Sequence, residues 1–180
     1  MGSRTIHNPH SNDVVTFMET SRETNGARSV IENRCGAGGG VPLHYHNEFD
    51  EEIVAVDGPL TVTLGNRTLT LQPGERVVVP RGTPHCFRNA TSGEVTFQAN
   101  LVPGSTGFEN FLRVLAGLSQ DGKVNRAGLP DLRTFAMMSR WADTNLCGAL
   151  SVMNPVMSLL ARRAEKSGLG DRLRARYECD

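Results

Sequence analysis

The sequence predicts an all-β domain followed by a few C-terminal α-helices. Between residues 13 and 102, short runs rich in β-branched residues alternate with glycine, proline and asparagine turns. Strands spaced this closely suit a barrel or a sandwich. After Pro103-Gly104 the apolar residues change to a helical period. We therefore expect a β-barrel with an N-terminal arm over residues 1–104, and a helical extension over residues 105–180 that packs on the barrel or on a dimer partner.

Length and composition restrict the class of protein. The 180 residues suit one domain with enough core to fold alone, and the 19 basic and 19 acidic side chains give no net charge. No basic stripe appears, which argues against a nucleic-acid partner. The longest apolar stretch, 146–160, is interrupted by Asn154-Pro155 and is too short for a membrane span. The polar start, residues 1–9, does not resemble a signal peptide, so we expect a cytoplasmic protein with free thiols.

Turn signals separate the expected strands. Asn25-Gly26 and Gly65-Asn66 are typical of hairpins, and residues 80–84 form a rigid corner of proline and glycine. Residues 1–11 look like an irregular arm. The expected strands are 13–19, 27–34, 53–56, 60–64, 68–71, 76–79 and 94–102.

Three helices are expected in the extension. Residues 108–118 place five apolar side chains on one helical stripe, which is too large to leave in water. A second helix is expected over residues 131–143, with Asp131 as its N-cap. A third begins at Asn154-Pro155, with asparagine as the cap, and ends near Lys166. The stripe consists of Phe108, Phe111, Leu112, Leu115 and Leu118.

The segment from Gly38 to Gly58 contains residues suited to metal binding. His44 and His46 are two positions apart, so in a strand both imidazoles point to one side. Neutral imidazole is the commonest protein ligand for metals, and a carboxylate adds a hard oxygen. Strict alternation from His46 favours Glu48 as that carboxylate. Glu51 needs a turn or bulge within residues 47–50 to bring it inward.

A second stretch contains a third histidine, His85. Its spacing is Gly74, five residues, Pro80-Arg81-Gly82, two residues, His85, three residues and Asn89. The first stretch reads Gly38, five residues, His44-Tyr45-His46, four residues, Glu51, six residues and Gly58. Together the two stretches resemble the paired signatures of the cupin superfamily, over roughly residues 28–103.

This resemblance implies a cupin barrel, a double-stranded β-helix or jelly roll, with one metal ion inside. Its ligands would be His44, His46, Glu51 and His85; the family spacing selects Glu51 and leaves Glu48 as the alternative. Three imidazoles and one carboxylate suit Fe, Mn, Ni, Cu or Zn as divalent ions, and spacing does not choose among them. The resemblance also implies a homodimer.

The chain further resembles quercetin-dioxygenase-like cupins. That resemblance implies a metal-dependent oxidoreductase acting on a small enolisable or phenolic substrate, with Glu51 as a catalytic base. The alternatives are a redox-neutral isomerase, a polyketide-type cyclase, or a cupin that only binds or senses a small ligand. In alternating strands, Ile53 and Ala55 point to the same side as Glu51, and Phe87 points to the same side as His85. We therefore expect these three side chains to line a substrate pocket inside the barrel.

Overall fold

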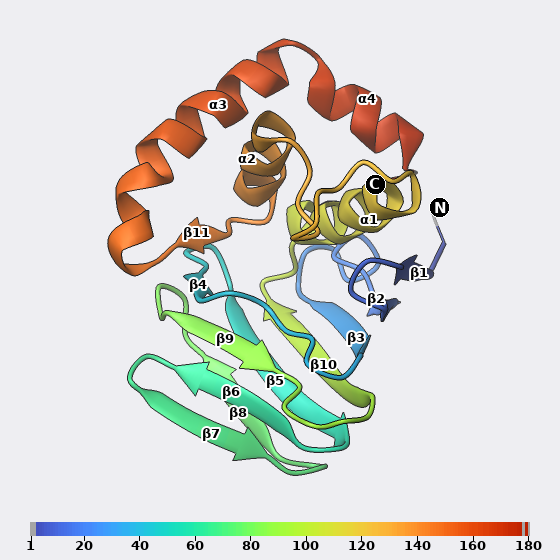
Figure 1. Ribbon diagram of the computed structural model, residues 1–180, viewed down its shortest axis with the longest axis vertical. Helices are drawn as coiled ribbons and strands as arrows, with labels where there is room; N and C mark the ends of the chain where they lie inside the picture. Colours follow the sequence, from blue (N-terminus) through green and yellow to red (C-terminus); the bar gives the residue numbers. More distant parts are fainter. Residues whose placement is uncertain (1–2, 178, 180) are drawn as a thin grey trace.

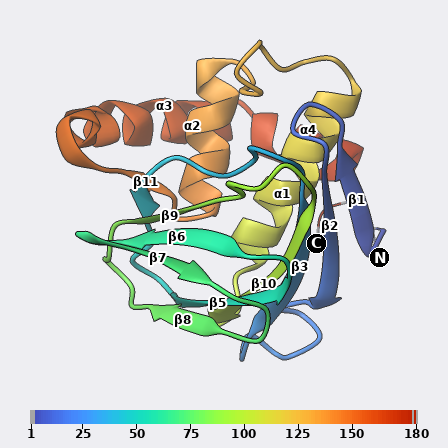
Figure 2. The same ribbon diagram turned by 60° about the horizontal axis from the view of Figure 1, so that its bottom comes forward.

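A computed structural model of the protein describes residues 3–177 and 179. Two antiparallel sheets lie face to face, and helices cover one end of them (Figures 1 and 2). The first sheet has the order β1 (Thr5–Asn8), β2 (Asp13–Glu19), β3 (Ser29–Cys35), β10 (Val95–Val102), β5 (Asp50–Asp57), β8 (Arg76–Val79). The second has the order β11 (Asn145–Leu146), β4 (His44–Tyr45), β9 (His85–Arg88), β6 (Leu60–Leu64), β7 (Arg67–Leu71).

The all-β expectation was too narrow. Among the described residues, four α-helices follow β10, with the short strand β11 between the second and the third, and the two sheets are not closed into a barrel. The helices are α1 (Thr106–Gln120), α2 (Leu132–Trp141), α3 (Asn154–Lys166) and α4 (Leu169–Arg176), with a 3-10 turn, η1 (Gly148–Met153), before α3. No helix in the described part of the chain is long and apolar enough to cross a membrane.

The main core lies between the two sheets. Alternate residues of β5 are buried, as a strand with one face on a core requires. Ile53 and Ala55 on this strand are fully buried and cluster with Val62 of β6. Phe87 of β9 packs against the same cluster, with its ring 4.5 Å from that of Phe97. The three proposed wall residues thus face inward, and their contact with a substrate stays a prediction.

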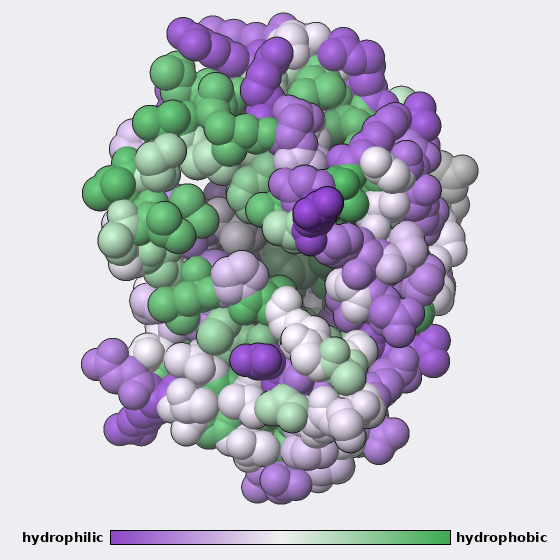
Figure 3. Space-filling view, in the orientation of Figure 1, coloured by the Kyte–Doolittle hydropathy of each residue, from purple (hydrophilic) through white to green (hydrophobic). Residues whose placement is uncertain are grey.

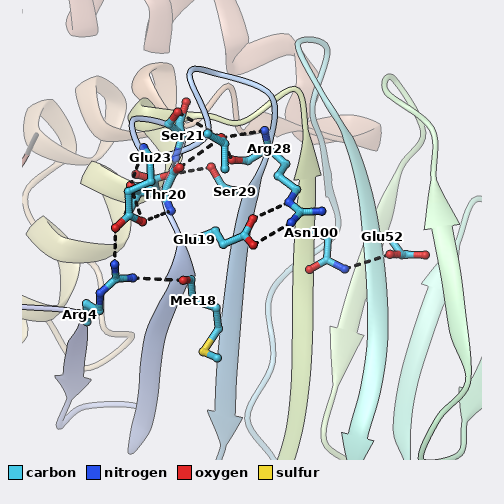
Figure 4. Close-up of polar contacts among 12 residues, drawn as sticks. Arg4, Met18, Glu19, Thr20, Ser21, Glu23, Arg28, Ser29, Glu52 and Asn100 are labelled. Carbon is cyan, nitrogen blue, oxygen red and sulfur yellow. Dashed lines mark hydrogen bonds and ion pairs between the residues drawn. The ribbon is translucent and has the colours of Figure 1, made fainter.

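The N-terminal arm is more regular than expected. Residues Thr5–Asn8 form strand β1, which pairs antiparallel with β2 and places Ile6 opposite Val15. Pairing satisfies main-chain groups that an irregular arm would leave to water, and Ile6 adds to an apolar cluster. The Arg4 side chain also donates to the carbonyl of Met18, 3.1 Å away (Figure 4). Residues 1–2 of the arm lie outside the described residues.

Helix α1 is anchored to the first sheet by a buried carboxylate. Glu109 is 1% exposed and accepts hydrogen bonds from the Ser21 N–H at 2.7 Å and the Ser29 hydroxyl at 2.5 Å. These bonds offset the cost of burying a charged group. Nearby, Arg28 pairs with Glu19 on the neighbouring strand (Figure 4). The helix is therefore fixed on the β3 side of the sheet.

The apolar side chains of α1 pack into two different apolar clusters. Phe108 and Leu112 pack against a cluster that includes Phe49, just before β5, and Leu101 on β10. Phe111 and Leu115 pack against the helical cluster formed with α2, α3 and α4. Helix α1 thus joins the sheets to the other helices, which explains why so long a stripe is apolar.

The later helices match the expected ones with two corrections. Asp131 caps α2 as expected, accepting from the Arg133 and Thr134 N–H groups at 3.1 and 3.2 Å. Asn154, however, is the first residue of α3 rather than its cap, because its amide is bonded to Leu146. Helix α4 was not expected; it begins after Gly168, which turns the chain with a φ of 70°.

Candidate metal centre

Four side chains from three strands and an adjoining loop meet at one point. His44 on β4 lies opposite His85 on β9, His46 follows β4, and Glu51 comes from β5. One donor atom from each lies within 4.8 Å of the other three. His46, Glu51 and His85 are buried, and His44 is partly exposed. The four residues selected by the family spacing are therefore the four that the fold brings together.

Main-chain carbonyls set the orientation of all three imidazoles. The Nδ1 atoms of His44, His46 and His85 lie 2.8, 3.0 and 2.9 Å from carbonyl oxygens, which belong to Pro42, Asp143 and Thr83. A carbonyl only accepts, so each Nδ1 carries a hydrogen and donates it. In a neutral imidazole the Nε2 atom then presents its lone pair. This arrangement is typical of histidines that bind metals, in which the outer nitrogen fixes the ring.

The carboxylate of the cluster is Glu51, and strict alternation from His46 was wrong. Its Oε2 atom lies 2.9 Å from Nε2 of His85. Glu48 is exposed, and it does not belong to the four-residue cluster of donors. Residues Asn47 and Glu48 both face outward while Phe49 is 1% exposed, so the segment turns instead of alternating. The turn changes the side to which the following residues point, and Glu51 points inward as a result.

Burial and mutual charge give the four groups different pKa values. Burial, helped by the neighbouring His85 and His46, lowers the pKa of His44 to about 4. Burial also lowers the pKa of His46. Burial opposes charge on the Glu51–His85 pair as well, but their hydrogen bond and attraction outweigh it: the pKa of Glu51 is lowered and that of His85 is raised. The low pKa values of His44 and His46 keep these imidazoles neutral beside the carboxylate, and the loss of the His85 proton completes a donor set that suits a divalent cation.

Aromatic rings pack against His46. Its imidazole stacks on Phe49 with centroids 4.4 Å apart and meets the edge of Phe108 at 5.7 Å. Phe108 was expected to be buried; it is partly buried, and its contact with His46 was not foreseen. In the sequence, Phe108 stands out only as a member of the apolar stripe over residues 108–118, and that stripe does not show which residue its ring contacts.

Asp143 is a further site residue that the sequence analysis missed. It follows α2, 97 positions after His46, yet its carbonyl is the acceptor for His46 Nδ1. No spacing in the sequence connects the two residues. A cavity of about 290 Å³ borders Asp143 between α2 and α3. On this side of the molecule, Figure 3 shows hydrophobic side chains gathered near η1 and the start of α3, where Val152 and Leu159 are exposed.

Comparison with known proteins agrees with this geometry. A family model described as a cupin domain matches residues 34–102. Quercetin 2,3-dioxygenase from Bacillus subtilis (strain 168) is 35% identical over 75 residues, which is 42% of this chain. The segment that contains strands β4 to β10 is therefore similar to a cupin domain. The chain spans about a fifth of that relative, since the match covers 22% of the dioxygenase.

Two solved structures are similar to part of this chain, at low sequence identity. A predicted oxalate decarboxylase from Thermotoga maritima is 16% identical, with a TM-score of 0.49 over 57% of this chain and 98% of that one. The polyketide cyclase RemF from Streptomyces resistomycificus is 24% identical, with a TM-score of 0.45 over 50% of this chain and 64% of that one. Both are too distant to carry an argument about activity. All four clustered residues lie inside the matched residues 34–102, and Asp143 lies outside them.

Proposed function

We propose that His44, His46, Glu51 and His85 hold one divalent transition-metal ion, and that this protein is a cupin dioxygenase for a small enolisable or phenolic substrate. The observation that carries the metal site is the common arrangement of the three imidazoles. Each donates through Nδ1 to a carbonyl and directs Nε2 to a point shared with the Glu51 carboxylate.

The donor set fits such an ion. Three nitrogens and one carboxylate oxygen suit Fe(II), Mn(II), Ni(II), Cu(II) or Zn(II). They carry one negative charge between them, which partly neutralises a divalent cation. When bound, the ion supplies Lewis acidity that makes an enol or phenol easier to ionise.

Glu51 is the residue we assign to proton transfer. It is 5% exposed, and its lowered pKa keeps the carboxylate ionised, so it can accept the proton that the substrate hydroxyl loses. In the metal-free protein a hydrogen bond from His85 holds it in place. Ile53, Ala55 and Phe87 share its inward phase, and we propose that they exclude water and contact the flat face of the substrate.

The dioxygenase assignment draws support from the Bacillus subtilis relative, which is named for that activity and is 35% identical over 75 residues. The same four residues also suit a redox-neutral isomerase or cyclase, in which the ion acts only as a Lewis acid. The two classes differ in whether dioxygen is consumed.

The test combines metal analysis with oxygen uptake. Protein purified without added metal is analysed for its metal content, and then assayed with flavonols and 1,3-diketones in an oxygen electrode. We expect about one equivalent of metal, and oxygen consumption in proportion to product. Turnover that proceeds equally well without oxygen, with Zn(II) substituting fully, would replace the dioxygenase by the isomerase or cyclase. Binding that alters the metal spectrum without any product would favour a sensing cupin.

We further propose that the protein is a homodimer, and that residues 1–104 and 105–180 are its two structural parts. The sheets and the helices have separate apolar clusters, joined through α1, which supports this division. Light scattering on the full chain tests the dimer, and a monomeric mass would contradict it.

A further inference from the structure

Directly after helix α2, beside the candidate metal centre, the backbone adopts an unusual conformation at Asp143. Asp143 has a φ of 47°, in the left-handed region that asparagine, aspartate and glycine tolerate best. In this conformation its carbonyl accepts the His46 Nδ1–H at 3.0 Å. Its carboxylate accepts the N–H of Asn47, and that of Glu48 at 2.7 Å. One residue therefore contacts the ring of His46 and the two peptide groups that follow it.

The segment after Asp143 is also held against the strand of the site. Asn145 donates through its side-chain amide to the Asp143 carbonyl at 2.9 Å and to its carboxylate at 3.0 Å. Strand β11 then pairs with β4, placing Leu146 opposite His44. The Asn154 amide holds Leu146 by two hydrogen bonds of 3.1 Å each. The Asp143 carbonyl thus accepts hydrogen bonds from both the His46 ring and the Asn145 amide, which hold it in place.

The four candidate ligands therefore depend on two different parts of the chain. Glu51 and His85 lie on strands of the sheets. His44 lies on β4, which pairs with β11, and His46 is bonded to Asp143, so both contact the helical extension. The Asp143 carboxylate also contacts the segment that precedes Glu51. It fixes the turn at Asn47 and Glu48, and this turn sets the inward phase of Glu51.

We infer that Asp143 is a positioning residue of the metal centre, so the helical extension takes part in metal binding. This inference rests on the proposed metal site. The Asp143 carbonyl selects the tautomer and orientation of the His46 ring, and its carboxylate holds the turn that directs Glu51 inward. Partners of this kind around a metal typically change metal affinity by about 10- to 100-fold when they are removed.

The competing explanation is that Asp143 only attaches the helices to the sheets. Asp131, at the opposite end of α2, provides a matched control. Its carboxylate also accepts two main-chain N–H groups, from Arg133 and Thr134, but it caps the helix start. A purely structural role predicts that losing either carboxylate has the same effect on the metal.

The experiment uses Co(II) as the probe, on the full chain freed of other metals. Affinity is measured against a competing chelator, and the visible spectrum of bound Co(II) reports the ligand geometry. Asp143→Gly keeps the left-handed backbone but removes the carboxylate. We expect it to weaken Co(II) binding by about 10- to 100-fold and to alter the spectrum. Asp143→Asn keeps an acceptor oxygen and should restore most of the affinity. Asp131→Ala should lower the melting temperature with little change in Co(II) affinity.

The outcomes separate this inference from the proposed metal site. If the unmodified protein binds Co(II) and Asp143→Gly leaves affinity and spectrum unchanged, the positioning role is wrong while the metal site stands. An equal loss in Asp131→Ala also overturns it. Absence of Co(II) binding by the unmodified protein overturns both. Should Asp143→Gly not fold, Asn145→Ala removes a donor that fixes the Asp143 carbonyl. It should then weaken Co(II) binding in the same direction, and unchanged affinity would contradict the inference.

Discussion

The Nε2 atoms of His44 and His46 lie 3.1 Å apart. Because each ring donates a hydrogen through Nδ1 to a main-chain carbonyl, neutral imidazoles present two lone pairs to each other at this distance. Two lone pairs so close repel unless a proton or a cation lies between or beside them. The partner of Nε2 in His85 is the Glu51 carboxylate. The cluster is thus arranged to receive a cation.

Two separate substitutions test which carboxylate binds the metal. Glu51→Gln should lower the affinity for Zn(II) by more than the roughly 10- to 100-fold typical of residues around a metal, since it removes a direct charged donor. Glu48→Gln should leave the affinity unchanged, because Glu48 is exposed outside the cluster. Competition with a fluorescent chelator measures both. Equal losses in the two variants, or a larger loss at Glu48, would show that the turn at residues 47–50 is interpreted wrongly.

Metal binding should weaken with acid in two steps. Burial opposes the charge of His85, but its bond to Glu51 raises the pKa, so a proton at His85 competes with the metal first. Affinity should fall by about tenfold per pH unit below this raised pKa, and level off above it, since one proton is displaced per ion. The pKa of His44, brought by burial to about 4, adds a second proton and a steeper fall only near that pH. Chelator competition across the acidic and neutral range measures the slopes, and an affinity independent of pH would contradict the ligand set.

Phe49 is expected to be important for stability. Its ring is 1% exposed, stacks on His46 and lies beside Phe108 of α1. Phe49→Ala should therefore reduce the free energy of unfolding by about 3–5 kcal/mol, the usual cost of deleting a buried ring. Val56→Ala on β5 is the control; Val56 is 42% exposed and should change stability by less than about 1 kcal/mol. Urea unfolding of the metal-free protein gives both values, and similar losses would show that Phe49 is not a core residue.

The thiol of Cys35 should be inert in the folded protein. It is 2% exposed, and burial, together with the nearby charge of Asp13, raises its pKa to about 12. Only thiolates react readily with alkylating reagents, so Cys35 should be modified after Cys86 and Cys147, which are partly exposed. Mass spectrometry of peptides after timed alkylation gives the order. Modification of Cys35 first, without denaturant, would indicate local opening of β3.

Some of the candidate site was predictable from the sequence because its signals are local. His44 and His46 are two residues apart in a short extended segment, so their common side follows from strand geometry. His85 follows a corner of proline and glycine that fixes the chain just ahead of it. The choice of Glu51 over Glu48 came from family spacing, whereas alternation alone pointed to Glu48, because alternation assumes an uninterrupted strand. The turn that breaks it is held partly by Asp143, far along the chain.

Glu51 and His85 joined the candidate ligand set through the resemblance to cupins. The sequence by itself determined the strand-rich first part, the helical second part, the α2 cap at Asp131 and the common side of His44 and His46. These depend on the period of apolar residues, on turn residues and on short spacings, which act between neighbours in the chain. Only the tertiary structure decided that β1 pairs with β2, that Phe108 packs on His46, and that the carbonyl of Asp143 accepts from His46 Nδ1. Main-chain acceptors are the same in every residue, so the contact between Asp143 and His46 has no signature in the sequence and arises only when the packed helices bring α2 to the end of β4.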